Sequence, residues 1–68
     1  MANAALLEEK IVLSGKTKTY LAKQLNVSRA WALKLFKKPE VMTYGQAEMM
    51  RRELCISSRK EMNDIFLP

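Results

Sequence analysis

The chain has 68 residues, of which 49% are hydrophobic, and its formal net charge is +5. This length makes one small domain, so we treat residues 1–68 as a single unit with one core. Histidine is missing, and Cys55 is the only cysteine, which excludes an internal disulfide and a structural zinc site of thiols and imidazoles. Cys55 lies between Leu54 and Ile56, which predicts a small buried residue rather than a nucleophile. We therefore expect no enzyme and no metal or cofactor.

Charged residues interrupt the apolar residues near the start of the chain, at Glu8, Glu9 and Lys10. A secretory signal needs an unbroken apolar stretch there, and a membrane-spanning helix needs roughly 20 apolar residues. No run in the sequence has either property. We therefore expect a cytoplasmic protein that has no membrane partner.

The basic charge is concentrated between Lys16 and Lys38. That stretch holds seven basic and no acidic residues, whereas the rest of the chain, with five basic and seven acidic residues, has a net charge of −2. A patch of one sign attracts a polyanion, and neutralising phosphates releases their counterions. On charge alone, a solvated lysine-rich surface is an equally good interpretation. The pattern inside the stretch has to decide between the two.

Apolar spacing predicts a first helix over residues 4–13. Asn3 is placed to cap its start, and Gly15 is placed to end it. We assign this helix a structural role. Its predicted inner face consists of Leu6, Leu7, Ile11 and Leu13.

Two short helices follow, and a tight turn separates them. Thr17 is a good N-cap for the second helix, which is predicted over residues 18–25, and Ser28 is a good N-cap for the third. Asn26 lies in the turn, because asparagine adopts the left-handed backbone conformation more readily than most residues. Val27 follows it and is predicted to pack into the core.

The third helix is predicted over residues 29–37, because Pro39 disfavours helical geometry at the residue before it. Steps of about 100° per residue divide its side chains into two arcs. Trp31 lies at the border of the inner arc, so we expect it to pack at the core margin. The inner arc consists of Ala32, Leu35 and Phe36, and the outer arc of Arg29, Ala30, Leu33, Lys34 and Lys37.

Two capping signatures predict the remaining helices. Thr43 and Gln46 have the spacing of a capping box, which opens a fourth helix that ends near Leu54. Ser58 and Glu61 repeat that spacing and open a last short helix. No strand-like alternation of useful length occurs. The predicted fold is therefore all-α, a compact five-helix bundle in which the second and third helices form a helix-turn-helix.

The segment from Thr17 to Lys38 has the features that a recognition helix needs. Ala22 is small enough for the next helix to cross closely, and the outer face of that next helix is basic. The chain here resembles the lambda-repressor-like family, the Cro and repressor type of helix-turn-helix found in phages and bacteria. It departs from that family at Asn26, where glycine is usual, and at the small Ala32. The resemblance is carried by Leu21, Ala22, Leu25, Asn26, Val27, Ser28, Arg29, Ala32 and Leu35.

The resemblance implies that the third helix reads duplex DNA. Arg29 would bond guanine, and Ala30 and Leu33 would meet thymine methyl groups. The base-reading positions are Arg29, Ala30, Leu33 and Lys34, and the backbone-binding positions are Thr17, Lys18, Thr19, Ser28, Lys37, Lys38, Thr43 and Tyr44. These assignments have alternatives. Arg29 and Lys34 could be solvated side chains, and Leu33 could contact a partner subunit. Thr17 and Ser28 could serve as helix caps alone.

The implied function is that of a transcription regulator, more specifically a Cro-like repressor, that binds a double-stranded DNA operator. One small module buries too little DNA for high specificity, so we expect a homodimer on a two-fold symmetric site. We expect no small-molecule ligand. Two alternatives stay open: a helical protein-interaction module of the antirepressor kind, and an architectural or recombination-directing DNA binder. The dimer contact is predicted within residues 56–68, at Ile56, Ile65, Phe66 and Leu67.

Overall fold

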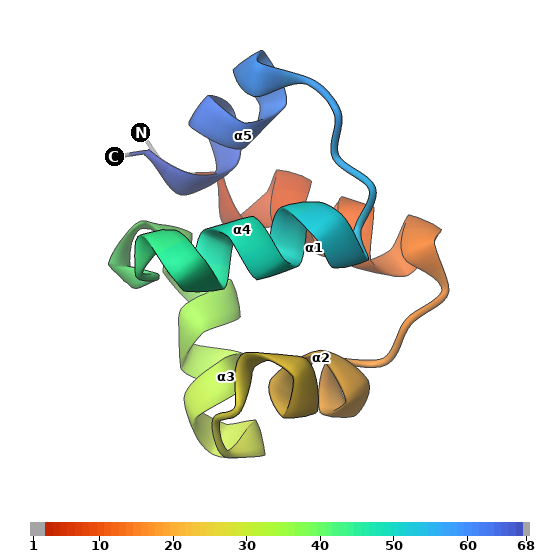
Figure 1. The fold of residues 1–68 in the computed structure, drawn as a ribbon, viewed down its shortest axis with the longest axis vertical. Helices are drawn as coiled ribbons and strands as arrows, with labels where there is room; N and C mark the ends of the chain where they lie inside the picture. The colour runs from red at the N-terminus through yellow and green to blue at the C-terminus, as the bar shows by residue number, and fades with distance from the viewer. Residues whose placement is uncertain (1–2, 68) are drawn as a thin grey trace.

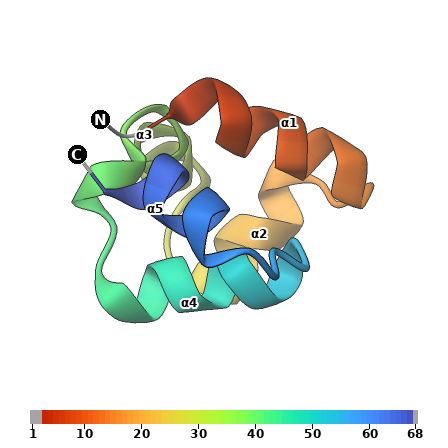
Figure 2. The same ribbon diagram turned by 90° about the horizontal axis from the view of Figure 1, so that it is seen from above.

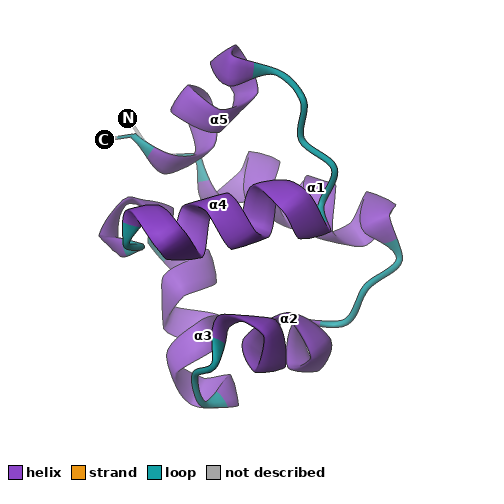
Figure 3. Ribbon diagram, in the orientation of Figure 1, coloured by secondary structure: helices purple, strands orange, loops and turns teal. Residues whose placement is uncertain are grey.

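The computed structural model of the protein describes residues 3–67. Within that range all regular structure is helical and the remaining residues form turns and loops, with no strand (Figure 3). The prediction of an all-α five-helix bundle is therefore confirmed for the described residues. The helices are α1 (Ala4–Ser14), α2 (Lys18–Leu25), α3 (Arg29–Lys37), the short 3-10 helix η1 (Pro39–Val41), α4 (Tyr44–Glu53) and α5 (Arg59–Phe66).

The helix α4 lies between α5 on one side and the α2–α3 pair on the other (Figure 1). Seen from above, α1 and α4 lie at opposite edges of the molecule, and α5 lies between them (Figure 2). The Asn3 amide donates a hydrogen bond to the Ile65 carbonyl at 3.3 Å, which joins the start of α1 to the end of α5. The helix-turn-helix thus packs against α1 and α4, and α5 packs against α1 and η1.

A polar side chain caps the start of each α-helix, as the sequence predicts. In each case the side-chain oxygen accepts a hydrogen bond from the backbone amide three residues later, at 2.9–3.3 Å. This contact satisfies one of the amides that the first helical turn leaves without a partner. The five caps are Asn3, Thr17, Ser28, Thr43 and Ser58.

The two predicted capping boxes differ. At Thr43 the box is complete, because Gln46 Oε1 also accepts a hydrogen bond from the Thr43 amide at 2.9 Å. At Ser58 only the serine makes its contact. The Glu61 carboxylate instead binds Lys10 Nζ of α1 at 2.6 Å. A long-range ion pair therefore replaces the local contact that the spacing favours.

Among residues 3–67, three adopt the left-handed conformation where helices end or the chain turns. Gly15 follows α1 with φ 74°, and Asn26 follows α2 with φ 60° and ψ 43°, both as predicted. Cys55 follows α4 with φ 55° and is exposed, so the prediction that it is buried is wrong. Its neighbours Leu54 and Ile56 both point into the core, which turns the residue between them outward.

One continuous cluster forms the core and includes residues from every α-helix. The prediction for Leu13 is wrong, because its side chain is 73% exposed. Leu7 and Ile11, four residues apart, form the buried stripe of α1, and Leu13 lies about 200° around the helix from Ile11. The buried apolar residues are Leu7, Ile11, Leu21, Ala22, Leu25, Ala32, Leu35, Phe36, Met50, Leu54, Ile56, Ile65 and Phe66.

Candidate nucleic-acid interface

The turn between α2 and α3 spans Asn26 to Ser28 and brings the two helices into close contact. Ala22 of α2 is only 3% exposed, and Ala32 of α3 is only 1% exposed. Small side chains at both positions let the two backbones approach. Leu35 and Phe36 anchor the same side of α3 in the core, which turns the opposite side of α3 to solvent.

The outer side of α3 carries four exposed residues of the predicted site: Arg29, Ala30, Lys34 and Lys37. Leu33 differs from them, because it is half-buried and packs against the edge of the core. Lys38 is also exposed and follows directly after the last residue of α3. The outer side is therefore basic, with a small apolar centre at Ala30.

Ion pairs remove two of the seven cations of residues 16–38 from this basic surface. Lys18 Nζ lies 2.9 Å from Glu8 Oε1 of α1, so a predicted phosphate contact has an acidic neighbour. Lys16 Nζ lies 3.0 Å from Glu53 Oε1 and 2.6 Å from the Glu53 carbonyl oxygen. The other five form no ion pair within residues 3–67, and they are Lys23, Arg29, Lys34, Lys37 and Lys38.

The Lys16–Glu53 contact joins the connection before α2 to the end of α4. The hydrogen bond between the two side chains raises the pKa of Lys16 and lowers the pKa of Glu53. Both shifts favour the charged forms, because each charge stabilises its partner. Lys16 is therefore part of the support that holds α2 in place, and not of the basic surface on α3.

The predicted backbone-binding residues with hydroxyl groups fall into two sets. Thr17, Ser28 and Thr43 serve as N-caps, in which the oxygen accepts a hydrogen bond and the hydroxyl proton stays available to a ligand. Thr19 and Tyr44 are exposed, with Tyr44 reaching 87%. Tyr44 also lines a groove between α4 and α5.

That groove has a volume of about 420 Å³ and lies away from the basic surface, since no residue of α2 or α3 lines it. Its walls are largely apolar, with Ala47 and Met62 partly buried. Arg51 and Glu48 also line the groove and form an ion pair with each other. The molecule thus has a second distinct surface besides the outer side of α3.

The predicted dimer residues need a correction. Ile56 and Ile65 are 2% and 0% exposed, and Phe66 is 8% exposed, because all three belong to the core of the single chain. The excess of apolar residues in this segment is therefore used within one copy. Leu67 is 54% exposed and is the one residue of the four that has an open side chain. Pro68, the end of the predicted segment, lies outside the described residues.

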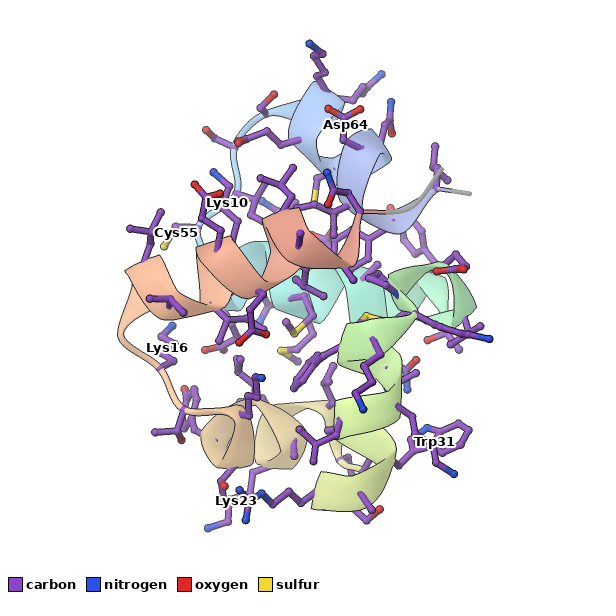
Figure 4. All side chains as sticks on the ribbon, turned by 180° about the vertical axis from the view of Figure 1, so that it is seen from behind. Lys10, Lys16, Lys23, Trp31, Cys55 and Asp64 are labelled. Carbon is purple, nitrogen blue, oxygen red and sulfur yellow. The ribbon has the colours of Figure 1, made fainter. Side chains whose placement is uncertain are left out.

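Trp31 lies on this surface, although the sequence did not assign it to the candidate site. It is 49% exposed and points outward from α3 (Figure 4), so the prediction of packing at the core margin is wrong. Lys34 Nζ lies 5.8 Å from the centre of its ring. The helical projection places Trp31 between the two arcs, and only the packed structure decides to which side it turns.

No known protein family, curated protein or solved structure matches the chain. None of the helices within residues 3–67 has the length and apolar character needed to cross a membrane. The same residues contain no group of three or more acidic, cysteine or histidine side chains placed to hold a metal ion.

Proposed function

We propose that this chain is a sequence-specific double-stranded DNA-binding transcription regulator that acts in the cytoplasm as a Cro-like repressor. The observation that carries the proposal is the outer side of α3, where Arg29, Lys34 and Lys37 are all exposed and no acidic residue occurs in the helix. An α-helix with its side chains is about 10–12 Å wide, and the major groove is about 12 Å wide. A helix of this charge and width therefore suits the groove.

The proposed contacts divide into base reading and backbone binding. Arg29, Ala30 and Lys34 face bases, and the open part of Leu33 lies beside them. Lys18 has to exchange Glu8 for a phosphate, which is feasible because both side chains are partly exposed and such surface pairs contribute little. The remaining backbone contacts are Thr17, Thr19, Ser28, Lys37, Lys38, Thr43 and Tyr44. This role is binding, without a catalytic step.

We further propose a homodimer, because a single module of this size covers too little DNA for high specificity. Two copies related by a two-fold axis would read half-sites about one helical turn apart. Leu67 is retained as a contact, since its side chain is exposed.

The test is selection of binding sites from a random duplex DNA pool, followed by a salt titration of the enriched duplex. The proposal expects an enriched two-fold symmetric site and an affinity that falls steeply with salt, because bound phosphates release counterions. Salt-dependent binding without enrichment would replace the regulator by an architectural DNA binder. If no duplex binds even at low salt, the proposal of DNA binding is refuted.

The groove between α4 and α5 supports a second candidate, a protein-interaction module. Its apolar walls suit a segment of another protein, and they lie outside the basic surface. Met62→Asp would place a charge in the groove and abolish such an interaction. Under the DNA proposal the same change leaves the affinity of one chain for DNA unaltered, provided that the variant remains folded.

A further inference from the structure

Trp31 combines three features that the proposed function leaves unused. Its side chain is a large apolar surface that is 49% exposed, although most of its neighbours along α3 are either buried aliphatic residues or cations. It carries an indole N–H for which the structure records no acceptor within residues 3–67. Its ring also lies beside the ammonium group of Lys34, at 5.8 Å. An exposed tryptophan costs solvation free energy unless a partner covers it.

The place of Trp31 on α3 defines what that partner would contact. Trp31 and Lys38 are seven residues apart, so they lie along the same flank of the helix, and Lys34 is the outer-side residue next to that flank. Ala30, Lys34 and Lys37 form the centre of the outer side, opposite the buried residues of α3. Trp31 therefore lies to one side of the residues that the proposed function directs at base edges.

Because a helix nearly fills the major groove, its flanks face the walls of the groove and not its floor. Those walls consist of deoxyribose rings and phosphates. An indole suits this boundary, since its face packs on a sugar while its N–H donates to a phosphate oxygen. Lys38 on the same flank adds charge complementarity to the phosphates on that wall.

We propose that Trp31 binds the sugar-phosphate wall of the major groove in duplex DNA, beside the phosphate contacts of Lys38. This inference rests on the proposed function and adds to it a contact that is independent of base sequence. Its effect is to fix how deeply and in which register α3 enters the groove. The cation–aromatic contact with Lys34 holds the indole next to a base-reading residue before DNA binds.

Trp31 is the sole tryptophan, so its fluorescence reports on this one position. The experiment titrates the chain with the duplex enriched from the random pool and with an unrelated duplex of equal length. At each point, quenching by neutral acrylamide measures how accessible the indole is, and the anisotropy of a labelled duplex measures affinity. We expect both duplexes to shield Trp31 from acrylamide.

Three variants accompany the titration. Trp31→Ala is expected to weaken binding to both duplexes by the same factor, about tenfold, which corresponds to about 1.4 kcal/mol. Trp31→Phe keeps an apolar ring without the N–H and is expected to recover part of that loss. Leu13→Ala, at another exposed apolar residue (73%), is the matched control and is expected to bind as the parent does. Circular dichroism checks that each variant is folded.

The possible outcomes separate the two proposals. If DNA binds to the parent while Trp31 stays accessible and Trp31→Ala binds equally well, the wall contact is refuted and the DNA-binding function stands. If Trp31→Ala weakens only the enriched duplex, Trp31 reads bases and the wall contact is again refuted. If Trp31 becomes shielded from acrylamide as the protein concentration rises in the absence of DNA, Trp31 contacts a second copy of the chain and not DNA. If neither duplex binds to the parent, it is the proposed function that has failed.

Discussion

The α2–α3 pair and the α4–α5 pair share two backbone features. Each connection contains one non-glycine residue with positive φ, Asn26 at 60° and Cys55 at 55°. Each second helix starts at a serine cap, Ser28 or Ser58. Both pairs bury their inner residues in the same core. The conformation at the turn and the capping therefore do not distinguish the two pairs, although only α2 and α3 pack closely against each other.

Their surfaces differ in the arrangement of charge. The helices α2 and α3 contain cations and no acidic residue. The helices α4 and α5 contain four acidic residues, and three of these form ion pairs, at Glu48, Glu53 and Glu61. Two of these ion pairs, Glu53–Lys16 and Glu61–Lys10, join elements of the chain, whereas every cation of α2 and α3 except Lys18 is unpaired within residues 3–67. Surface charge, and not the helix pair itself, is therefore the basis of the proposed function.

The largest effects are expected from removing cations of α3. Arg29→Ala should cost about 1–3 kcal/mol of discrimination for the preferred duplex, because a forked contact to guanine is lost. Lys37→Ala should weaken binding to all duplexes alike and reduce the salt slope by about one, since it removes one phosphate contact. Fluorescence anisotropy at several salt concentrations measures both quantities.

The matched control is Lys60→Ala in α5, another exposed lysine that forms no ion pair within residues 3–67. It should leave the affinity almost unchanged. If Lys60→Ala weakens binding as much as Lys37→Ala does, the two surfaces are equivalent and the comparison fails. If the Arg29 and Lys37 variants behave alike, the division into base and phosphate contacts is wrong.

Sequence patterns gave the helix bounds well, because the signals are local. Thr17, Ser28 and Thr43 cap helices through contacts that span only three residues. The 3-10 helix η1 was not predicted, because three residues are too few to show a period. Pro39 within it is buried, and η1 packs between α3 and α5. That contact is a tertiary one, which no local pattern reports.

Predictions about surfaces were less reliable, because they depend on residues far apart in sequence. The exposed cations of α3 follow from helical geometry alone, whereas the pairing of Lys16 with Glu53 spans 37 residues. The sequence alone indicated that Ile65 and Phe66 exceed what a last short helix needs, whereas the structure buries both in the core. Trp31 lay on the border of two arcs, where a small rotation of the helix decides its exposure.

A smaller effect is expected from the two positive-φ residues. Cys55→Gly should raise the free energy of unfolding by up to about 1 kcal/mol, because the side chain at φ 55° is strained. Asn26→Gly should gain less, since asparagine tolerates this conformation better. Urea denaturation measures both. Cys55→Ala keeps a Cβ atom and should show no gain. A loss of stability in Cys55→Gly would mean that the thiol makes contacts that outweigh the strain.

The smallest effect concerns the ion pair that joins α4 to the connection before α2. The Lys16 hydrogen bond lowers the pKa of Glu53 from its ordinary value of 4.5. A carboxyl group whose pKa is lower in the folded state stabilises the protein above its unfolded pKa, and this contribution is lost as the pH falls through the folded pKa. Lys16 has a raised pKa, so its contribution is lost only when the pH rises above 10.5.

Glu53→Gln should therefore lower the urea midpoint slightly at pH 7, and the gap to the parent should narrow as the pH falls below 4.5. High salt should narrow the same gap, because the pair is partly exposed and ions screen it. Glu9→Gln in α1, an exposed carboxylate with no ion pair within residues 3–67, should show no gap at pH 7 or pH 3. If the difference in urea midpoint between Glu53→Gln and the parent is the same at pH 3 as at pH 7, packing and not charge joins α4 to the connection before α2. The contrast between paired and available charge would then lose its strongest example.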